Sequence, residues 1–199
     1  MTALSIDIEA KRYPGADGAP AQTVLRDVVL AVEAAQFLCI LGPSGCGKTT
    51  LLNLIAGLDQ DFEGRISIAR EPGRDQPRIG YVFQNPTLLP WRSVIENLRL
   101  VMAADQIARG LDLALLDAMG LLDYRDAYPK SLSLGMSRRV ALARAFAVEP
   151  DLLLMDEPFV SLDESTADGL RHLLLQIWQA KPTTVLFVTH DSREAIQLA

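Results

Sequence analysis

Apolar and polar residues alternate near the start of the chain. From Leu4 to Glu9 every second residue is apolar, which is the period of a strand with one buried face. Other apolar runs are short, and one of them ends at Gly42, which is typical of a buried parallel strand. The further strands that we expect are residues 24–32, 37–41, 64–69, 79–83, 152–155 and 185–189.

Two parts of the chain have helical spacing instead. Residues 48–56 carry leucines and an isoleucine about one helical turn apart, and Gly57 is placed to end that helix. Residues 85–150 predict a mainly helical lobe. The apolar residues at helical spacing in this lobe are Leu98, Val101, Met102, Leu111, Leu115, Leu116 and Met119.

The order of the predicted elements indicates the fold class. Strands and helices alternate on both sides of the helical part, so we expect one α/β domain over residues 1–199 with an α-helical lobe inserted at about 85–150. The stretch from Pro14 to Pro20 is rich in turn-forming residues and predicts a turn between two strands.

Composition limits the functions open to such a domain. Of the 199 residues 49% are hydrophobic, which suffices for a core and argues against disorder. The 25 acidic residues outnumber the 19 basic ones, and a formal net charge of −6 disfavours a nucleic-acid partner. Cys39 and Cys46 suggest no disulfide framework and favour a reducing compartment. We expect neither a membrane-spanning helix nor a secretory signal.

One glycine-rich segment between a predicted strand and a predicted helix has the pattern of a phosphate-binding loop. The segment reads GPSGCGKT from Gly42 to Thr49. Glycines let several backbone N–H groups converge on one anion, Lys48 adds a positive charge for the β- and γ-phosphates, and the Thr49 hydroxyl can bind Mg²⁺. The alternative is a glycine turn beside a surface lysine. The nucleotide-binding residues that we expect here are Gly42, Pro43, Ser44, Gly45, Cys46, Gly47, Lys48, Thr49 and Thr50.

Two carboxylates follow the apolar run at residues 152–155. Asp156 and Glu157 should emerge at the carboxyl edge of the sheet, where ligands bind in open α/β folds. Asp156 is placed to hold Mg²⁺ through water, and Glu157 to orient and deprotonate an attacking water, which favours hydrolysis over transfer by a small-molecule kinase. The alternative is a solvated turn before Pro158.

Several further motifs occur in a fixed order along the chain. The sequence SLSLGMSRR, from Ser131 to Arg139, precedes a helical run; Gln84 follows the strand at 79–83; and His190 follows the strand at 185–189. Together with the phosphate loop and the acid pair, these segments resemble the ATP-binding subunits of ABC transporters over essentially the whole chain. The matching motifs are the signature motif at Ser131–Arg139, the Q-loop at Gln84, the D-loop at Ser161–Asp163, the switch histidine at His190 and the adenine-stacking aromatic at Tyr13.

The resemblance implies a P-loop NTPase core with an antiparallel β subdomain and the inserted helical lobe. It also implies a homodimer in which Ser133 and Gly135 of one copy complete the ATP site of the other. Gln84 would sense Mg²⁺ and the γ-phosphate, Asp163 would lie beside the nucleotide, and His190 would stabilise charge on the γ-phosphate. Two alternatives remain open: His190 could be an ordinary residue at a strand end, and Tyr13 could be a hydrophobic residue at the rim of the site. His172 has no motif around it and is interpreted as a surface or packing residue. The expected catalytic residues are Glu157, His190, Gln84 and Lys48; the expected metal ligands are Thr49, Gln84 and Asp156; and the expected cofactors are ATP and Mg²⁺.

Three features depart from the family pattern. Leu134 replaces the first signature glycine, and Arg138 replaces the glutamine that usually precedes the arginine. Leucine restricts the backbone and adds bulk, so we expect impaired or retuned closure of the dimer. The chain ends at Ala199, so the resemblance implies that the C-terminal part of the family fold is absent.

The segment Gln84–Trp91 resembles importers for nitrate, sulfonates and taurine. This resemblance implies that the chain docks to integral membrane permease subunits and acts with a solute-binding protein that it does not contact directly. It also implies a cytoplasmic location on the inner face of the membrane. The alternative is that Leu88, Leu89 and Trp91 pack the helical lobe. Rival functions are a cassette that binds ATP with little hydrolysis, a DNA-repair or chromosome ATPase, and a translation-factor relative.

Overall fold

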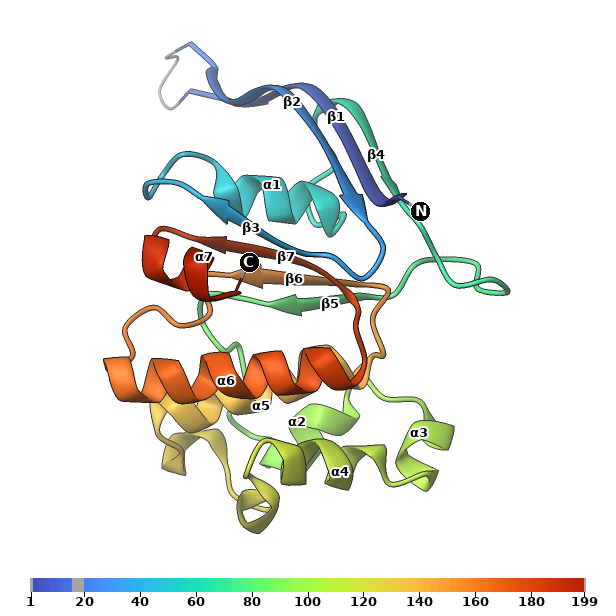
Figure 1. The fold of residues 1–199 in the computed structure, drawn as a ribbon, viewed down its shortest axis with the longest axis vertical. Coiled ribbons are helices and arrows are strands. Elements are labelled where there is room, and N and C mark those ends of the chain that lie inside the picture. Colours follow the sequence, from blue (N-terminus) through green and yellow to red (C-terminus); the bar gives the residue numbers. More distant parts are fainter. Residues whose placement is uncertain (1, 16–19, 199) are drawn as a thin grey trace.

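The computed structural model describes residues 2–15 and 20–198, so residues 16–19 of the turn predicted at Pro14–Pro20 lie outside the described part. Figure 1 shows two sheets stacked above a helical layer. The strands are β1 (Thr2–Tyr13), β2 (Gln22–Glu33), β3 (Phe37–Leu41), β4 (Glu63–Ile68), β5 (Ile79–Val82), β6 (Leu152–Asp156) and β7 (Thr184–Thr189). The α-helices are α1 (Lys48–Ile55), α2 (Val94–Arg99), α3 (Ala104–Ala108), α4 (Leu111–Ala118), α5 (Leu134–Ala147), α6 (Glu164–Ala180) and α7 (Ser192–Leu198), with 3₁₀ turns at η2 (Leu122–Tyr124) and η3 (Pro129–Ser131).

The smaller sheet is antiparallel and has the strand order β2-β1-β4. Leu4, Ile6 and Ile8 are buried while Ser5 and Asp7 are exposed, which confirms the alternation predicted for the first strand. The buried face of this sheet lies over α1, which carries the phosphate loop at its start (Figure 1).

The larger sheet is parallel and has the strand order β3-β7-β6-β5. Its two central strands are buried along their whole length, as their apolar runs predict. The α/β class is confirmed, since these strands alternate with helices and the small antiparallel sheet stands beside them. Gly57 ends the helix before it with a positive φ of 70°, as its position in the sequence predicts.

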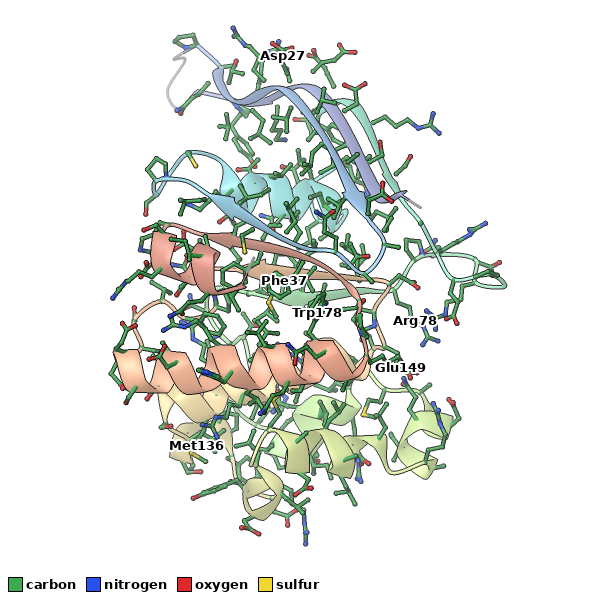
Figure 2. The ribbon with its side chains drawn as sticks, viewed as in Figure 1. Asp27, Phe37, Arg78, Met136, Glu149 and Trp178 are labelled. Atoms are coloured by element: carbon green, nitrogen blue, oxygen red, sulfur yellow. The ribbon has the colours of Figure 1, made fainter. Side chains whose placement is uncertain are left out.

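The central strands supply two hydrophobic cores, one on each face of the sheet. Leu153 and Phe187 point to the core shared with α5 and α6, whereas Leu154 and Leu186 point to the core shared with α1 and the small sheet. At the margin of the first core the rings of Phe37 and Trp178 meet edge to face, with centroids 5.7 Å apart (Figure 2). The sheet is therefore the common wall of both halves of the molecule.

Helices α2 to α5 lie between β5 and β6 in the chain and form the layer farthest from the small sheet (Figure 1). Helix α2 ends at Arg99, so Val101 and Met102, which stand at helical spacing in the sequence, lie beyond this helix. The amides of Val101 and Met102 donate hydrogen bonds to carbonyls three residues earlier. The next helix, α3, begins after Ala103, whose amide donates to the side-chain oxygen of Gln106. Hydrogen bonds of the turn, and the start of α3 at Ala104, therefore decide the local structure here rather than the spacing of apolar residues.

Candidate functional site

The carboxyl ends of the four parallel strands bring the sequence motifs to one edge of the sheet. Gly42 follows β3, His190 follows β7, Glu157 follows β6 and Gln84 lies just after β5. Adjacent strands lie about 4.8 Å apart, so the outermost two of these strand ends are separated by roughly 15 Å. The edge thus aligns the residues of four motifs that are far apart in sequence.

The phosphate loop is closed by its own lysine. Nζ of Lys48 donates to the carbonyls of Gly42, at 2.8 Å, and Pro43, at 2.9 Å. Helix α1 starts directly after the loop, and its first turn contains no acidic residue and no side-chain cap. The N–H groups of this first turn are therefore left for an anion, and the helix dipole favours a negative charge at this place.

Gly47 is a loop position where backbone conformation and space both favour glycine. Its φ is 97°, and an added Cβ would lie 2.9 Å from Cδ2 of Leu25 and 3.1 Å from Cγ1 of Val24. Gly45 also has a positive φ, 79°, but an added Cβ there meets nothing within 4 Å. The tight approach of β2 to the loop thus requires glycine at 47 for space as well as for backbone conformation.

A cleft of about 400 Å³ lies over the loop and carries both charges of the site, Lys48 and Glu157. Gln84 lines the same cleft from the end of β5, which is the outermost strand of the sheet opposite to β3, the strand that leads into the loop. Nine of the residues predicted from sequence do not line it: Tyr13, Gly42, Pro43, Cys46, Ser133, Gly135, Asp156, Asp163 and His190. Its lining residues are Gln22, Val24, Ser44, Gly45, Gly47, Lys48, Thr49, Thr50, Gln84 and Glu157.

Both carboxylate oxygens of Glu157 have a side-chain partner. Nζ of Lys48 lies 3.2 Å from Oε1, and Nδ1 of His190 lies 2.7 Å from Oε2. The backbone of Glu157 has a φ of 44°, which is uncommon for a residue with a side chain, and its amide donates to the carbonyl of Val188 at 3.0 Å. Strain of this kind tends to be retained at functional sites. Glu157 is therefore oriented at the cleft by β7 as well as by Lys48 and His190.

Asp156 lies behind the cleft, nearly buried, at the end of β6. Burial raises the pKa of this carboxyl, and the neighbouring Glu157 adds to the rise, while a hydrogen bond with Thr49 and the charge of Lys48 lower it. Within residues 2–15 and 20–198, no three His, Cys, Asp or Glu side chains form a complete metal-binding group. The hydroxyl and carboxylate of Thr49 and Asp156 fit Mg²⁺, which commonly takes one or two protein ligands and completes its shell with phosphates and water.

The signature segment forms the start of α5. Ser133 caps this helix, since its Oγ accepts a hydrogen bond from the Met136 amide at 3.2 Å. Gly135 is buried, and an added Cβ would lie 2.8 Å from Cγ2 of Thr166 on α6. Leu134 is 44% exposed, so the leucine that replaces a family glycine faces outward and is not used in the core.

Asp163 and Tyr13 are each engaged in local hydrogen bonds. Asp163 caps α6, and the bonds from Thr166 and Ser165 lower its pKa to about 2. The hydroxyl of Tyr13 donates to Asp59 at 3.1 Å, and the same carboxylate pairs with the fully buried Lys11 at 2.9 Å. The Tyr13 ring is partly exposed and held in orientation by this pair.

Several residues that support the site were not found from sequence. Buried Asn97 on α2 holds the segment after Gln84, because it accepts from the amide of Leu89 at 2.8 Å and donates to its carbonyl at 3.1 Å. Thr189 donates to the buried Glu194 at 2.5 Å and accepts from the amide after His190. The signal for Asn97 is a polar residue on the apolar face of a short helix. The signal for Glu194 is an acidic residue five positions beyond a strand end.

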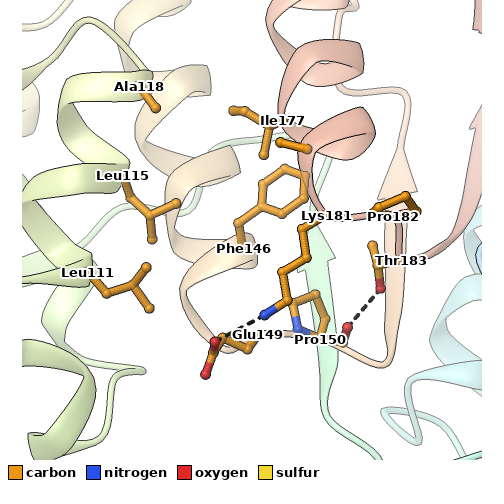
Figure 3. A pocket seen from close by; sticks show the side chains of 11 residues that line it. Leu111, Leu115, Ala118, Phe146, Glu149, Pro150, Ile177, Lys181, Pro182 and Thr183 are labelled. Atoms are coloured by element: carbon orange, nitrogen blue, oxygen red, sulfur yellow. Dashed lines mark hydrogen bonds and ion pairs between the residues drawn. The ribbon is translucent and has the colours of Figure 1, made fainter. Parts of the chain in front are cut away.

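A second cavity, of about 310 Å³, lies between α4, α5 and the end of α6 (Figure 3). Its walls are mostly apolar, and at its edge Lys181 pairs with Glu149 at 3.1 Å. None of the residues predicted from sequence to bind nucleotide or metal lines it. The polar cleft at the sheet edge is therefore the candidate site.

No helix in the described ranges combines the length and apolar character needed to cross a membrane.

Comparison with known proteins agrees with this geometry. A family model described as ABC transporter matches residues 25–160. The aliphatic sulfonates import ATP-binding protein SsuB of Bacillus licheniformis is 44% identical over 202 residues, covering 98% of this chain and 77% of that protein. The uncharacterized ABC transporter ATP-binding protein MJ0412 of Methanocaldococcus jannaschii is 44% identical over 183 residues, covering 88% of this chain and 67% of that protein.

Solved structures give the same result. The ATP-binding cassette MJ0796, in a dimeric post-hydrolysis state bound to ADP and Pi, matches with a TM-score of 0.82 and 30% identity, over 98% of this chain and 90% of that one. A putative metal-chelate type ABC transporter in an inward-facing conformation matches with a TM-score of 0.81 and 26% identity, over 100% of this chain and 77% of that one.

Proposed function

Since this chain belongs to the ABC transporter family and is an ATP-binding, ATP-hydrolysing subunit, we propose that it energises the import of aliphatic sulfonates through membrane permease subunits. The observation that carries the choice of solute is the 44% identity, over 98% of the chain, to a protein named for aliphatic sulfonates import. These relatives do not favour a cassette without hydrolysis or an ATPase unrelated to transport.

The triphosphate is proposed to bind along the cleft at the sheet edge. Its β- and γ-phosphates would rest on the loop Gly42–Thr49, where free N–H groups and Lys48 meet. Tyr13 would stack on the adenine ring, with Asp59 fixing the orientation of the tyrosine. Lys48 would exchange its bonds to the loop carbonyls and Glu157 for bonds to phosphate oxygens.

Mg²⁺ is proposed as the cofactor, held by the Thr49 hydroxyl, by Asp156 through water, and by Gln84. When bound, the ion would neutralise negative charge on the phosphate oxygens. Thr49 and Asp156 already interact with each other, and Gln84 lines the same cleft from the end of β5. The three side chains would thus approach the phosphates from three elements, namely α1, the end of β6 and the segment after β5.

Hydrolysis would be catalysed by positioning and charge. Glu157 would orient a water molecule toward the γ-phosphorus and accept its proton, as the bond to the leaving oxygen of ADP breaks. Nδ1 of His190 lies 2.7 Å from the same carboxylate, so it can donate to Glu157 and fix its orientation. A hydrogen bond to the γ-phosphate would come from the other ring nitrogen, Nε2, in the protonated ring. Lys48 would compensate the charge that develops on the phosphate oxygens.

Two copies of the chain are proposed to complete each other's sites. Ser133 and Gly135 at the start of α5 do not line the cleft of their own chain. In a head-to-tail homodimer they would reach the γ-phosphate held by the partner, and Asp163 would lie at the same interface. A related cassette of 30% identity is dimeric, which supports this arrangement.

The chain would dock on the inner face of the membrane through permease subunits, with a solute-binding protein acting indirectly. Two side chains suited to docking are Trp91, 68% exposed, and Leu100, 49% exposed. The test is uptake of a radiolabelled alkanesulfonate by cells that carry either the native chain or Lys48→Met. We expect uptake only with the native chain, which should also co-purify with a permease. Normal alkanesulfonate uptake with Lys48→Met, or loss of nitrate or taurine uptake alone, would contradict the proposed solute.

A further inference from the structure

One arginine of α5 connects three segments of the candidate site. Arg138 is 3% exposed, and its two terminal nitrogens bond to two different backbone carbonyls. Nη1 donates to the carbonyl of Gln84, and Nη2 donates to the carbonyl of Val160 at 2.9 Å. Its Nε has no hydrogen-bond partner, so the two carbonyl bonds account for the polar contacts of this buried cation.

The two carbonyls belong to the segments that carry the proposed catalytic groups. Gln84 lines the cleft itself. Val160 closes the turn that begins at Glu157, since its amide donates to the Glu157 carbonyl at 3.2 Å. Arg138 also lies in the second turn of the helix that Ser133 caps. A single guanidinium therefore joins Gln84, the Glu157 turn and the signature helix.

A second arginine of the same helix strengthens one of these connections. The terminal nitrogens of Arg144 donate to the carbonyls of Pro86, at 3.0 Å, and Thr87, at 3.1 Å, and to the Thr87 hydroxyl at 3.0 Å. Thr87 has a φ of 47°, so these bonds hold the segment in an uncommon backbone conformation. Residues 84–87 are thus attached to α5 at two points.

We propose that Arg138 is a positioning residue for ATP hydrolysis, which fixes Gln84 and Glu157 relative to each other and to the Ser133 end of α5. The inference rests on the proposed ATPase site. Movement of Gln84 toward the γ-phosphate would pull on α5 and so change the placement of Ser133 at the partner's site. Arginine suits this role because its rigid planar fork offers two separate nitrogens, whereas glutamine, usual here in the resembling family, offers one amide nitrogen on a shorter stem.

The test compares Arg138→Gln and Arg138→Lys with a matched control, Arg99→Gln. Arg99 pairs with the buried Asp112 at 2.7 Å within the helical layer, so its loss removes a guanidinium bond without touching the cleft. Both Arg138 variants should lower kcat about tenfold, because misplaced catalytic groups lose rate steeply, while the equilibrium Kd for ATP changes less than about threefold. Arg99→Gln should lower the urea midpoint of unfolding and leave kcat unchanged.

A double-mutant cycle with Gln84→Ala tests the route of the effect. If Arg138 acts through the Gln84 side chain, Arg138→Gln should cost much less in the Gln84→Ala background than alone. Fully additive effects, a native kcat in both Arg138 variants, or failure of both to fold while Arg99→Gln folds would overturn the inference. An absence of ATPase activity in the native chain would instead refute the proposed catalytic site.

Discussion

Nζ of Lys48 lies 3.2 Å from Oε1 of Glu157, so the cation expected to bind phosphate is paired with the carboxylate expected to activate water. Both side chains are largely buried, and such a pair interacts more strongly than one at the surface. A γ-phosphate that binds Lys48 must compete with Glu157. In the proposed site, nucleotide binding would therefore be coupled to release of Glu157 from Lys48.

The first prediction concerns this coupling. Glu157→Gln removes the charge that competes with phosphate for Lys48, so ATP affinity should rise several-fold. Hydrolysis should fall by at least about 100-fold, since a positioned base is worth roughly 10² to 10⁴ in rate. Equilibrium binding of a fluorescent ATP analogue and phosphate release measure the two effects. Weaker ATP binding would contradict the competition for Lys48, and hydrolysis within tenfold of native would show that Glu157 is not the base.

The second prediction compares two glycines of the phosphate loop. Gly47→Ala should lower the free energy of unfolding by about 1–3 kcal/mol, because strain at φ 97° adds to close contacts with Leu25 and Val24. Gly45→Ala should cost about 1 kcal/mol, since only the backbone conformation opposes it. Urea unfolding of both variants gives the difference. Equal losses would mean that packing against β2 contributes nothing at position 47.

The third prediction concerns the exposed signature leucine. Leu134→Gly should change the free energy of unfolding by less than about 1 kcal/mol, because the side chain is 44% exposed and glycine at a helix start costs little. If Leu134 obstructs the interface between two copies, ATPase activity per chain should rise and reach its plateau at a lower protein concentration. An unchanged concentration dependence would place Leu134 outside that interface.

The fourth prediction follows from the raised pKa of Asp156. Its folded-state pKa lies above the ordinary value of 3.8, so above pH 3.8 the folded state retains this proton more than the unfolded state does. The group's contribution to the free energy of unfolding therefore falls as pH rises through that window. Asp156→Asn should gain stability relative to the native chain on going from pH 3.5 to about pH 7, measured by urea unfolding at each pH.

The Asn variant should also lose Mg²⁺-dependent hydrolysis, since the proposed ligand is gone. A stability difference between the two proteins that does not change with pH would mean that Asp156 titrates normally in the folded state. A variant that becomes less stable relative to the native chain on going from pH 3.5 to about pH 7 would contradict the predicted direction.

The fifth prediction distinguishes the two cysteines. Burial raises the pKa of Cys39 to about 11, with Glu194 adding to the rise, whereas Cys46 is exposed on the phosphate loop. Because the thiolate is the reactive form, a maleimide at about pH 7 should label Cys46 alone in the folded chain and both cysteines in urea. ATP should slow the labelling of Cys46, as read by mass spectrometry. Rapid labelling of Cys39 in the folded chain would contradict the assignment.

The site residues that could be predicted from sequence are those that follow a buried strand. Asp156 and Glu157 come after an apolar run, and Lys48 lies between a strand and a helix, so the strand-end rule places them at one edge without knowledge of partners. The contacts of Arg138 could not be predicted, because its carbonyl partners lie 54 and 22 residues away and carry no side-chain signature. Apolar spacing alone does not locate the end of α2 at Arg99, because it depends on hydrogen bonds in the following turns.

The two central strands, β6 and β7, send alternate side chains into opposite hydrophobic cores. Neither core is complete without both strands. The helical layer and the half that carries the phosphate loop therefore both depend on the residues of β6 and β7. Heating should consequently melt the two halves in a single all-or-none transition. A destabilising change in the helical layer would then lower the melting temperature of the ATP cleft, although no residue of that cleft has changed.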